Sequence, residues 1–179
     1  MPLINFLCRA LFTGFFLLGT FPAVAFSADL QTIALTGQSA PGGPPGAPFQ
    51  EFGLAQINNV GVVEFVAGML PGTAGVTIDD AVGIWTASGG TITPITVGDP
   101  PAPGIPGAML ETIATAPQIS SAGAVLVEFQ LEIGVGGVTA DDNYAGFLFQ
   151  STGDRLLYRE GSSLPGFPTD EVDPKNWTA

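Results

Sequence analysis

The sequence predicts an all-β protein made of tandem four-stranded antiparallel units that resemble β-propeller blades. Two observations carry this prediction: a pattern that recurs every 62 residues, and a turn-rich composition with Gly 25 and Pro 16. Similar Pro/Gly-rich segments end at Gly42, Gly104 and Gly166, so the spacing is 104 − 42 = 62 and 166 − 104 = 62. A fixed period of this size is typical of one supersecondary unit copied in tandem.

The number of units is too small for a closed propeller, which needs about four to eight blades. The period runs through two units, at about residues 33–97 and 98–160, and a third begins at 161. We therefore expect an incomplete propeller. The alternative is a small open or sandwich-like β domain.

The first unit contains four segments with the composition of strands. Residues 58–61 form an Asn-x-x-Gly sequence that favours a type I turn, and Ser88-Gly89-Gly90 is typical of a hairpin loop. The flanking segments are rich in β-branched and aromatic residues. We expect strands at residues 51–57, 62–69, 83–87 and 91–97.

The second unit repeats these features. Residues 120–123 match the first turn, and residues 145–150 and 155–159 are expected to form a hairpin like that of residues 83–97. Residues 39–48 and 99–107 are expected to connect successive units, because proline cannot donate to a central ladder.

One irregularity interrupts the match between the units. Glu64 follows Gly61 after three residues, whereas Glu128 follows Gly123 after five. We infer a two-residue insertion, which would keep each side chain on its original face because the strand period is two. Glu64 and Glu128 would then occupy equivalent strand positions.

Residues 1–25 are expected to be a secretory signal peptide. Arg9 precedes the apolar residues 10–21, and Ala23-Val24-Ala25 is a small-x-small cleavage signal. About a dozen apolar residues is short for a membrane span, so no span is expected after cleavage. The β-repeat region is expected at residues 26–166, followed by an irregular tail at residues 167–179. The mature protein would be extracellular, periplasmic or at the cell surface.

The composition excludes several classes of function. Lys+Arg total 4 and Asp+Glu total 16, and the net charge of −12 disfavours nucleic acid and anionic lipid as partners. The chain has no histidine, and its one cysteine, Cys8, lies in the expected signal peptide. Histidine-dependent triads, disulfides and a cysteine nucleophile are therefore not expected in the mature chain.

The motifs resemble those of bacterial exported tandem-repeat proteins that carry an Asn-x-x-Gly-x-x-Ala-Phe repeat and varied C-terminal anchors. The resemblance rests on the turn of residues 58–61 followed by Phe65, on Gly83-Ile84-Trp85, and on Gly98-Asp99 with Ala102-Pro103-Gly104. Glu64 and Glu128 depart from the pattern, because they stand where the signature has alanine. The resemblance implies an exported repeat protein and assigns no catalytic residue.

These observations favour a noncatalytic exported or cell-surface module that binds protein or glycan. One alternative is a carboxylate-dependent hydrolase fragment, with Glu64 and Glu128 as the acid pair, since glycoside hydrolysis needs two nearby carboxyl groups. Another is a truncated gene product without independent function. Open edge strands would also allow the chain to self-associate.

Two acid pairs recur in corresponding loops and are candidate metal ligands. Asp79-Asp80 and Asp141-Asp142 each precede the expected third strand, where several oxygens could surround a Ca²⁺ ion. No other cofactor is expected. The alternative is that these aspartates stabilise turns and keep the loops solvated.

Overall fold

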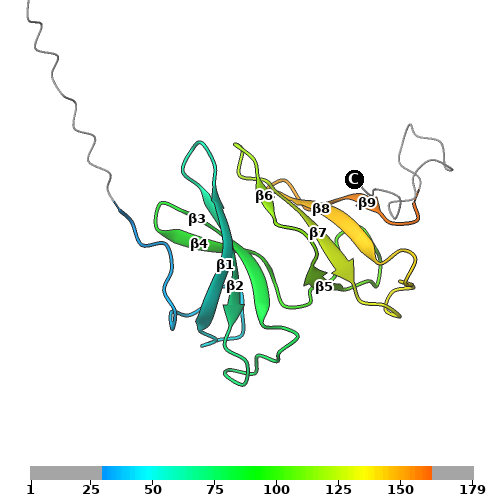
Figure 1. The fold of residues 1–179 in the computed structure, drawn as a ribbon, viewed down its shortest axis with the longest axis horizontal. Coiled ribbons are helices and arrows are strands. Elements are labelled where there is room, and N and C mark those ends of the chain that lie inside the picture. Colours follow the sequence, from blue (N-terminus) through cyan, green and yellow to red (C-terminus); the bar gives the residue numbers. More distant parts are fainter. Residues whose placement is uncertain (1–29, 163–179) are drawn as a thin grey trace, which may run out of the picture. The chain divides into compact units, whose positions relative to one another are not determined.

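The computed structural model describes residues 30–162, which form nine β-strands and no helix (Figure 1). All nine strands lie in one compact unit that starts at Thr32. The all-β prediction is confirmed. The expected signal peptide of residues 1–25 and the expected tail of residues 167–179 lie outside the described residues.

The first sheet contains four antiparallel strands in the order β1-β2-β3-β4. They are β1 (Phe49–Ile57), β2 (Val63–Met69), β3 (Val82–Ser88) and β4 (Thr91–Val97). Pro94 lies in β4, the outermost strand, where its missing N–H costs no ladder bond on the open side. The four strands expected from the sequence are therefore confirmed for the first unit.

Both predicted turns of the first sheet are present. The Gly61 N–H donates to Asn58 O at 3.2 Å, and Gly61 has a φ of 84°, which favours glycine. The Asn58 side-chain oxygen accepts from the N–H groups of Val60 and Val62 at 3.1 and 2.9 Å. Two further glycines with positive φ, at positions 89 and 90, join β3 to β4. Local sequence therefore determines where these strands end.

The second sheet has five strands, one more than predicted. They are β5 (Leu110–Ile113), β6 (Gln118–Ile119), β7 (Val125–Leu131), β8 (Tyr144–Phe149) and β9 (Arg155–Arg159). The order is β5-β7-β8-β9, and β6 also pairs with β7. The first strand of this sheet is thus split into β5 and β6.

Proline explains why this strand is interrupted. Residues 114–117 separate β5 from β6, and Pro117 has no N–H to donate to β7. In the first sheet β1 continues to Ile57 with a bulge between Phe52 and Ala55. The additional strand is a break in one strand of the unit and leaves the order of the others unchanged.

Corresponding hydrogen bonds in the two sheets are 62 residues apart. The Met69 N–H donates to Ala81 O at 2.6 Å, and the Leu131 N–H donates to Asn143 O at 2.7 Å. The strand register agrees over the same separation, with the pairs Val63↔Ala87 and Val125↔Phe149. The backbone therefore keeps a constant offset across β2 and β7.

This constant offset shows that the inferred two-residue insertion is wrong. At a separation of 62 residues, Glu64 corresponds to Leu126, and Glu128 corresponds to Val66. A shift by two residues preserves the face of every side chain, so alternation alone does not reveal it. Glu64 and Glu128 do not occupy equivalent positions.

Each sheet has a buried core. The first core contains Phe49, Phe65, Met69 and Trp85, and the Trp85 ring stacks on Phe65 with the centroids 6.0 Å apart. The residues of the second core come mainly from the second sheet, and Ile84 of β3 joins them. The two sheets therefore share apolar packing.

Within residues 30–162, no helix has the length and apolar character needed to cross a membrane.

Candidate functional site

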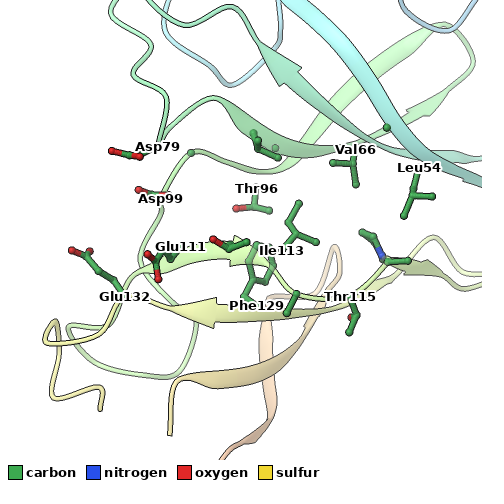
Figure 2. Close-up of a pocket in the computed structure, with 18 of the residues that line it drawn as sticks. Leu54, Val66, Asp79, Thr96, Asp99, Glu111, Ile113, Thr115, Phe129 and Glu132 are labelled. Carbon is green, nitrogen blue, oxygen red and sulfur yellow. The ribbon is translucent and has the colours of Figure 1, made fainter. Parts of the chain in front are cut away.

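A groove of about 880 Å³ lies between the two sheets. Its labelled lining residues are shown in Figure 2. The first sheet and its loops contribute Leu54, Val66, Asp79, Thr96 and Asp99, and the second sheet and its loops contribute Glu111, Ile113, Thr115, Phe129 and Glu132. Because both sheets supply walls, neither sheet alone contains the site.

Four carboxylates gather at one end of this groove (Figure 2). Asp79 lies in the loop between β2 and β3, and Asp99 follows β4. Glu111 is in β5 and Glu132 follows β7; the pairing of Leu110 with Leu131 brings these two positions to the same end of the second sheet. No lysine or arginine is among the described lining residues.

The acidic end carries unbalanced negative charge. Burial raises the pKa of Asp99, and the nearby carboxylates of Asp80, Asp79, Glu132 and Glu111 raise it further, in that order. Like charges disfavour ionisation of their neighbours, and a cation placed among them would be stabilised. This end of the groove is therefore suited to a positively charged group.

The rest of the groove is mainly apolar. Val66, Ile113 and Phe129 lie in its central part and Leu54 lies at the end away from the acids (Figure 2). Thr96 lies between the two regions; it is 7% exposed, and its hydroxyl has no hydrogen-bond partner among the described residues. An occupant with apolar side chains and one polar group would complement this part.

One wall of the groove is a free strand edge. Residues 111–117 line it without interruption, and β5 is the outermost strand of its sheet. An outermost strand presents N–H and C=O groups that can pair with an added strand. The groove therefore offers backbone hydrogen bonds as well as carboxylates and apolar contacts.

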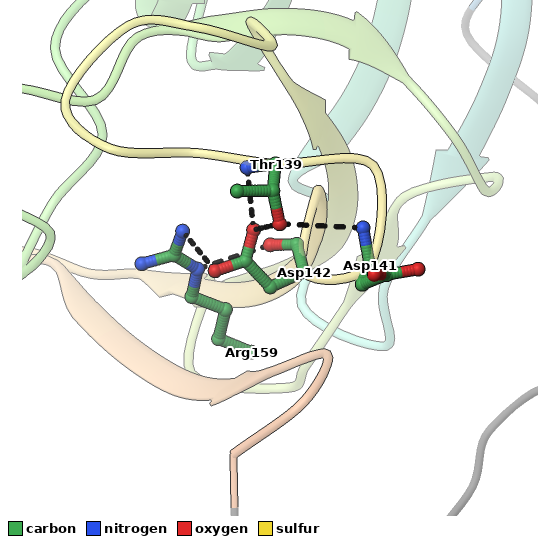
Figure 3. A network of polar contacts seen from close by, with 4 residues as sticks. All are labelled: Thr139, Asp141, Asp142 and Arg159. Carbon is green, nitrogen blue, oxygen red and sulfur yellow. Dashed lines mark hydrogen bonds and ion pairs between the residues drawn. The ribbon is translucent and has the colours of Figure 1, made fainter.

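The structure separates the four aspartates that the sequence suggested as calcium ligands. Asp79 lines the groove, and Asp80 accepts a hydrogen bond of 2.7 Å from the Thr77 hydroxyl. Asp141 and Asp142 lie in the corresponding loop of the second sheet (Figure 3). The described residues contain no group of three or more His, Cys, Asp or Glu side chains placed to hold a metal ion.

Asp142 is engaged in contacts within the protein (Figure 3). Its Oδ1 accepts from the N–H and hydroxyl of Thr139 at 2.7 and 2.9 Å. Its Oδ2 lies 2.7 Å from the Arg159 guanidinium, which also donates to Asp142 O at 3.0 Å. The backbone hydrogen bond from Thr139 and the contacts with Arg159 lower the pKa of Asp142. These contacts favour the turn-stabilising interpretation.

Thermal melting tests that interpretation. We expect Asp142→Asn to lower the melting temperature by about 2 °C, because asparagine loses the ionic contact with Arg159, which is partly exposed. The decrease should be the same in EDTA and in about 5 mM Ca²⁺, a concentration above the ~1 mM dissociation constants of extracellular calcium modules. A Ca²⁺-dependent rise in the wild type that Asp142→Asn abolishes would contradict the interpretation.

Glu64 and Glu128 are not brought together as an acid pair. Glu64 shares a face of β2 with Val66, which packs against the core of the second sheet. Glu128 lies on the opposite side of β7 from Phe129, a member of that core, and accepts a hydrogen bond from the Tyr158 hydroxyl. The second sheet and its core therefore separate the two carboxylates.

The acidic end was missed from the sequence because it is not repeated. The residue 62 positions after Asp99 is Gly161, so a search for recurring acids does not find Asp99. Glu111 and Glu132 could have been associated by pairing the start of one expected strand with the end of its antiparallel partner. No sequence signal shows that Asp79 and Asp99 approach them from the other sheet.

The described residues define an all-β protein of two open antiparallel sheets with an acidic groove between them. The chain belongs to the Family of unknown function (DUF7453), whose model matches residues 19–170. No curated protein and no solved structure matches the chain with statistical significance. Its function is therefore inferred from the groove and from the faces of the sheets.

Proposed function

We propose that this chain is an exported, noncatalytic β-repeat module that binds an extended, positively charged segment of a partner protein. The observation that carries the proposal is the groove with Asp79, Asp99, Glu111 and Glu132 at one end and apolar side chains along the rest. A lysine or arginine would lie among the carboxylates, and apolar side chains beside it would contact the floor.

Several features favour a peptide over a glycan. The free edge of β5 can pair with an extended backbone, a recurrent mode of peptide recognition. Glycan recognition commonly uses exposed aromatic platforms, whereas Phe129, the aromatic residue in the groove, is 3% exposed. A peptide segment therefore matches both the wall and the floor.

The noncatalytic part of the proposal rests on the absence of histidine and on the separation of Glu64 from Glu128. The proposal also includes an architecture in which the two sheets are successive blade-like units of an incomplete propeller. The constant 62-residue separation of corresponding hydrogen bonds and strand pairs supports this architecture.

Calorimetric titration with a short peptide of alternating lysine and valine tests the proposal. We expect the chain to bind this peptide, and the double variant Glu111→Gln/Glu132→Gln to weaken binding by about fivefold. This corresponds to about 1 kcal/mol, as expected for two partly exposed charges. Raising the salt concentration should weaken binding further, because the carboxylates at the rim are screened.

A second double variant, Glu51→Gln/Asp154→Asn, is the matched control. It removes the same charge from exposed positions that do not line the groove, so it should keep wild-type affinity. An equal loss in both double variants would show nonspecific attraction to an acidic chain and would contradict the proposal. Equal binding of a glutamate-valine peptide, or binding of an oligosaccharide without the lysine peptide, would also contradict it.

A further inference from the structure

The second sheet has an outer face that lies on the opposite side from its core. This outer face carries Leu126, Glu128, Leu148 and Tyr158. Leu126 is 40% exposed and Tyr158 is 38% exposed. Among the described residues, no other sheet packs on it.

The corresponding face of the first sheet is covered. The residues 62 positions before Leu126 and Glu128 are Glu64 and Val66. Glu64 is 1% exposed, and Val66 packs against the core of the second sheet together with Ile84. The chain itself therefore shows what covers such a face: the core side of another sheet of the same kind.

Hydrogen bonds support the same comparison. The Gln56 amide of the first sheet donates to Pro117 O of the second at 2.8 Å. Its counterpart in the second sheet is Gln118, whose amide donates to the nearby Ala116 O at 3.5 Å. The amide that crosses to a neighbouring sheet in the first case turns back to its own chain in the second.

The first sheet presents the complementary surface, which we call the aromatic face. Phe52 is 40% exposed there, and its ring lies 5.3 Å from Phe49 and 5.9 Å from Phe65 between centroids. Its counterpart Ile113, which is 61 positions later, packs against the core between the sheets. The aromatic face thus corresponds to the side of the second sheet that contacts the first.

A short stretch covers part of the aromatic face. Ile33 and Ala34 pack against its core, although they belong to no strand. Ile33 lies 62 positions before Ile95, which packs in the same way against the core of the second sheet. The counterparts of Val66 and Ile84, which complete the cover on the second sheet, are not among the described residues.

We infer that the outer face of the second sheet docks on the aromatic face of a second copy of this chain, displacing its residues 33–35. The contact would reproduce between copies the packing that Val66 and Ile84 make within one copy. It joins two different surfaces, so it is head-to-tail and generates a ring or an open chain of copies. This association uses sheet faces, whereas the groove between the sheets remains free.

Sedimentation equilibrium over a range of concentrations tests the docking. Leu126→Glu should abolish association, because it places a charge at the centre of the contact. Ile33→Asp should strengthen association by about tenfold, since it removes apolar packing worth about 1.5 kcal/mol that holds the cover in place. Val60→Glu, at a 67% exposed turn position, should match the wild type. Association should increase with salt, because the chains repel each other at a net charge of −12.

Single cysteines distinguish head-to-tail docking from other arrangements. In a chain with Cys8→Ser, a mixture of Phe52→Cys and Leu126→Cys proteins should form a mixed disulfide, whereas neither protein alone should form a dimer efficiently. A dimer of Leu126→Cys alone would show that two outer faces meet, and would overturn the inference. So would a monomeric Ile33→Asp variant, or association that Leu126→Glu leaves unchanged, which would indicate pairing of free strand edges.

Far-UV circular dichroism confirms that each variant is folded. The peptide titration separates this inference from the proposed function, because Leu126→Glu leaves the groove unchanged and should bind the lysine peptide normally. Peptide binding weakens with salt while association strengthens, so the two proposals fail independently.

Discussion

Replacing Trp85 with alanine should lower the free energy of unfolding by about 3–5 kcal/mol, the usual cost of removing a large aromatic side chain from a core. Trp85 is fully buried, and its ring centroid lies 5.0 Å from Phe49 and 6.0 Å from Phe65. Its indole N–H donates to Pro41 O at 2.8 Å, which ties the segment before β1 to the sheet. The substitution therefore removes packing and a hydrogen bond together.

Urea unfolding followed by far-UV circular dichroism measures this loss. Trp85→Phe is the matched variant: it keeps an aromatic ring in the core and leaves Pro41 O without its donor, so we expect a smaller loss of about 1–2 kcal/mol. Leu35→Ala, at a position that is 61% exposed, should change stability by less than about 0.5 kcal/mol. A Trp85→Ala variant as stable as Leu35→Ala would contradict the assignment of Trp85 to the core.

Replacing Glu64 with glutamine should make the protein more stable at neutral and alkaline pH. Glu64 is 1% exposed, and neither carboxylate oxygen has a hydrogen-bond partner among the described residues. Burial raises the pKa of Glu64 from 4.5 to about 7, because the charged form is poorly solvated between the sheets. At high pH the folded protein must hold an unpaired buried charge, which glutamine removes.

The pH dependence follows from these two pKa values. Below 4.5 the side chain is protonated in both states and its contribution is fully favourable; between 4.5 and about 7 the folded state binds more protons than the unfolded state. The wild type should therefore lose about 3 kcal/mol of stability relative to Glu64→Gln as the pH rises through this range, and little more above it.

Denaturant unfolding of both proteins between pH 4 and pH 9 gives this difference directly. Taking the difference cancels the titration of the other carboxylates, including Asp99. Glu51→Gln is the control, since Glu51 is exposed in β1 and its loss should give a nearly pH-independent difference. A difference between wild type and Glu64→Gln that stays constant across this range would show that Glu64 is not buried as an isolated carboxyl group.

Sequence reasoning was most successful where structure is local. The turn at residues 58–61 and the hairpin through Gly89 and Gly90 follow from side chains and φ preferences within a few residues, and both are present. It failed at Glu64 and Glu128, because two alignments that differ by two residues give the same alternation. The pairing of β2 with β3 and of β7 with β8 excludes one of them.

By itself, the sequence determined an all-β chain with strands bounded by glycine and proline turns, because backbone propensity and side-chain alternation act over short distances. Tertiary structure alone decided which carboxylates share a space. Asp79 and Asp99 reach Glu111 and Glu132 only when two sheets pack, and Glu64 becomes an isolated buried acid only when the second sheet covers it. Burial and electrostatic coupling depend on residues far apart in the chain, which local pattern does not encode.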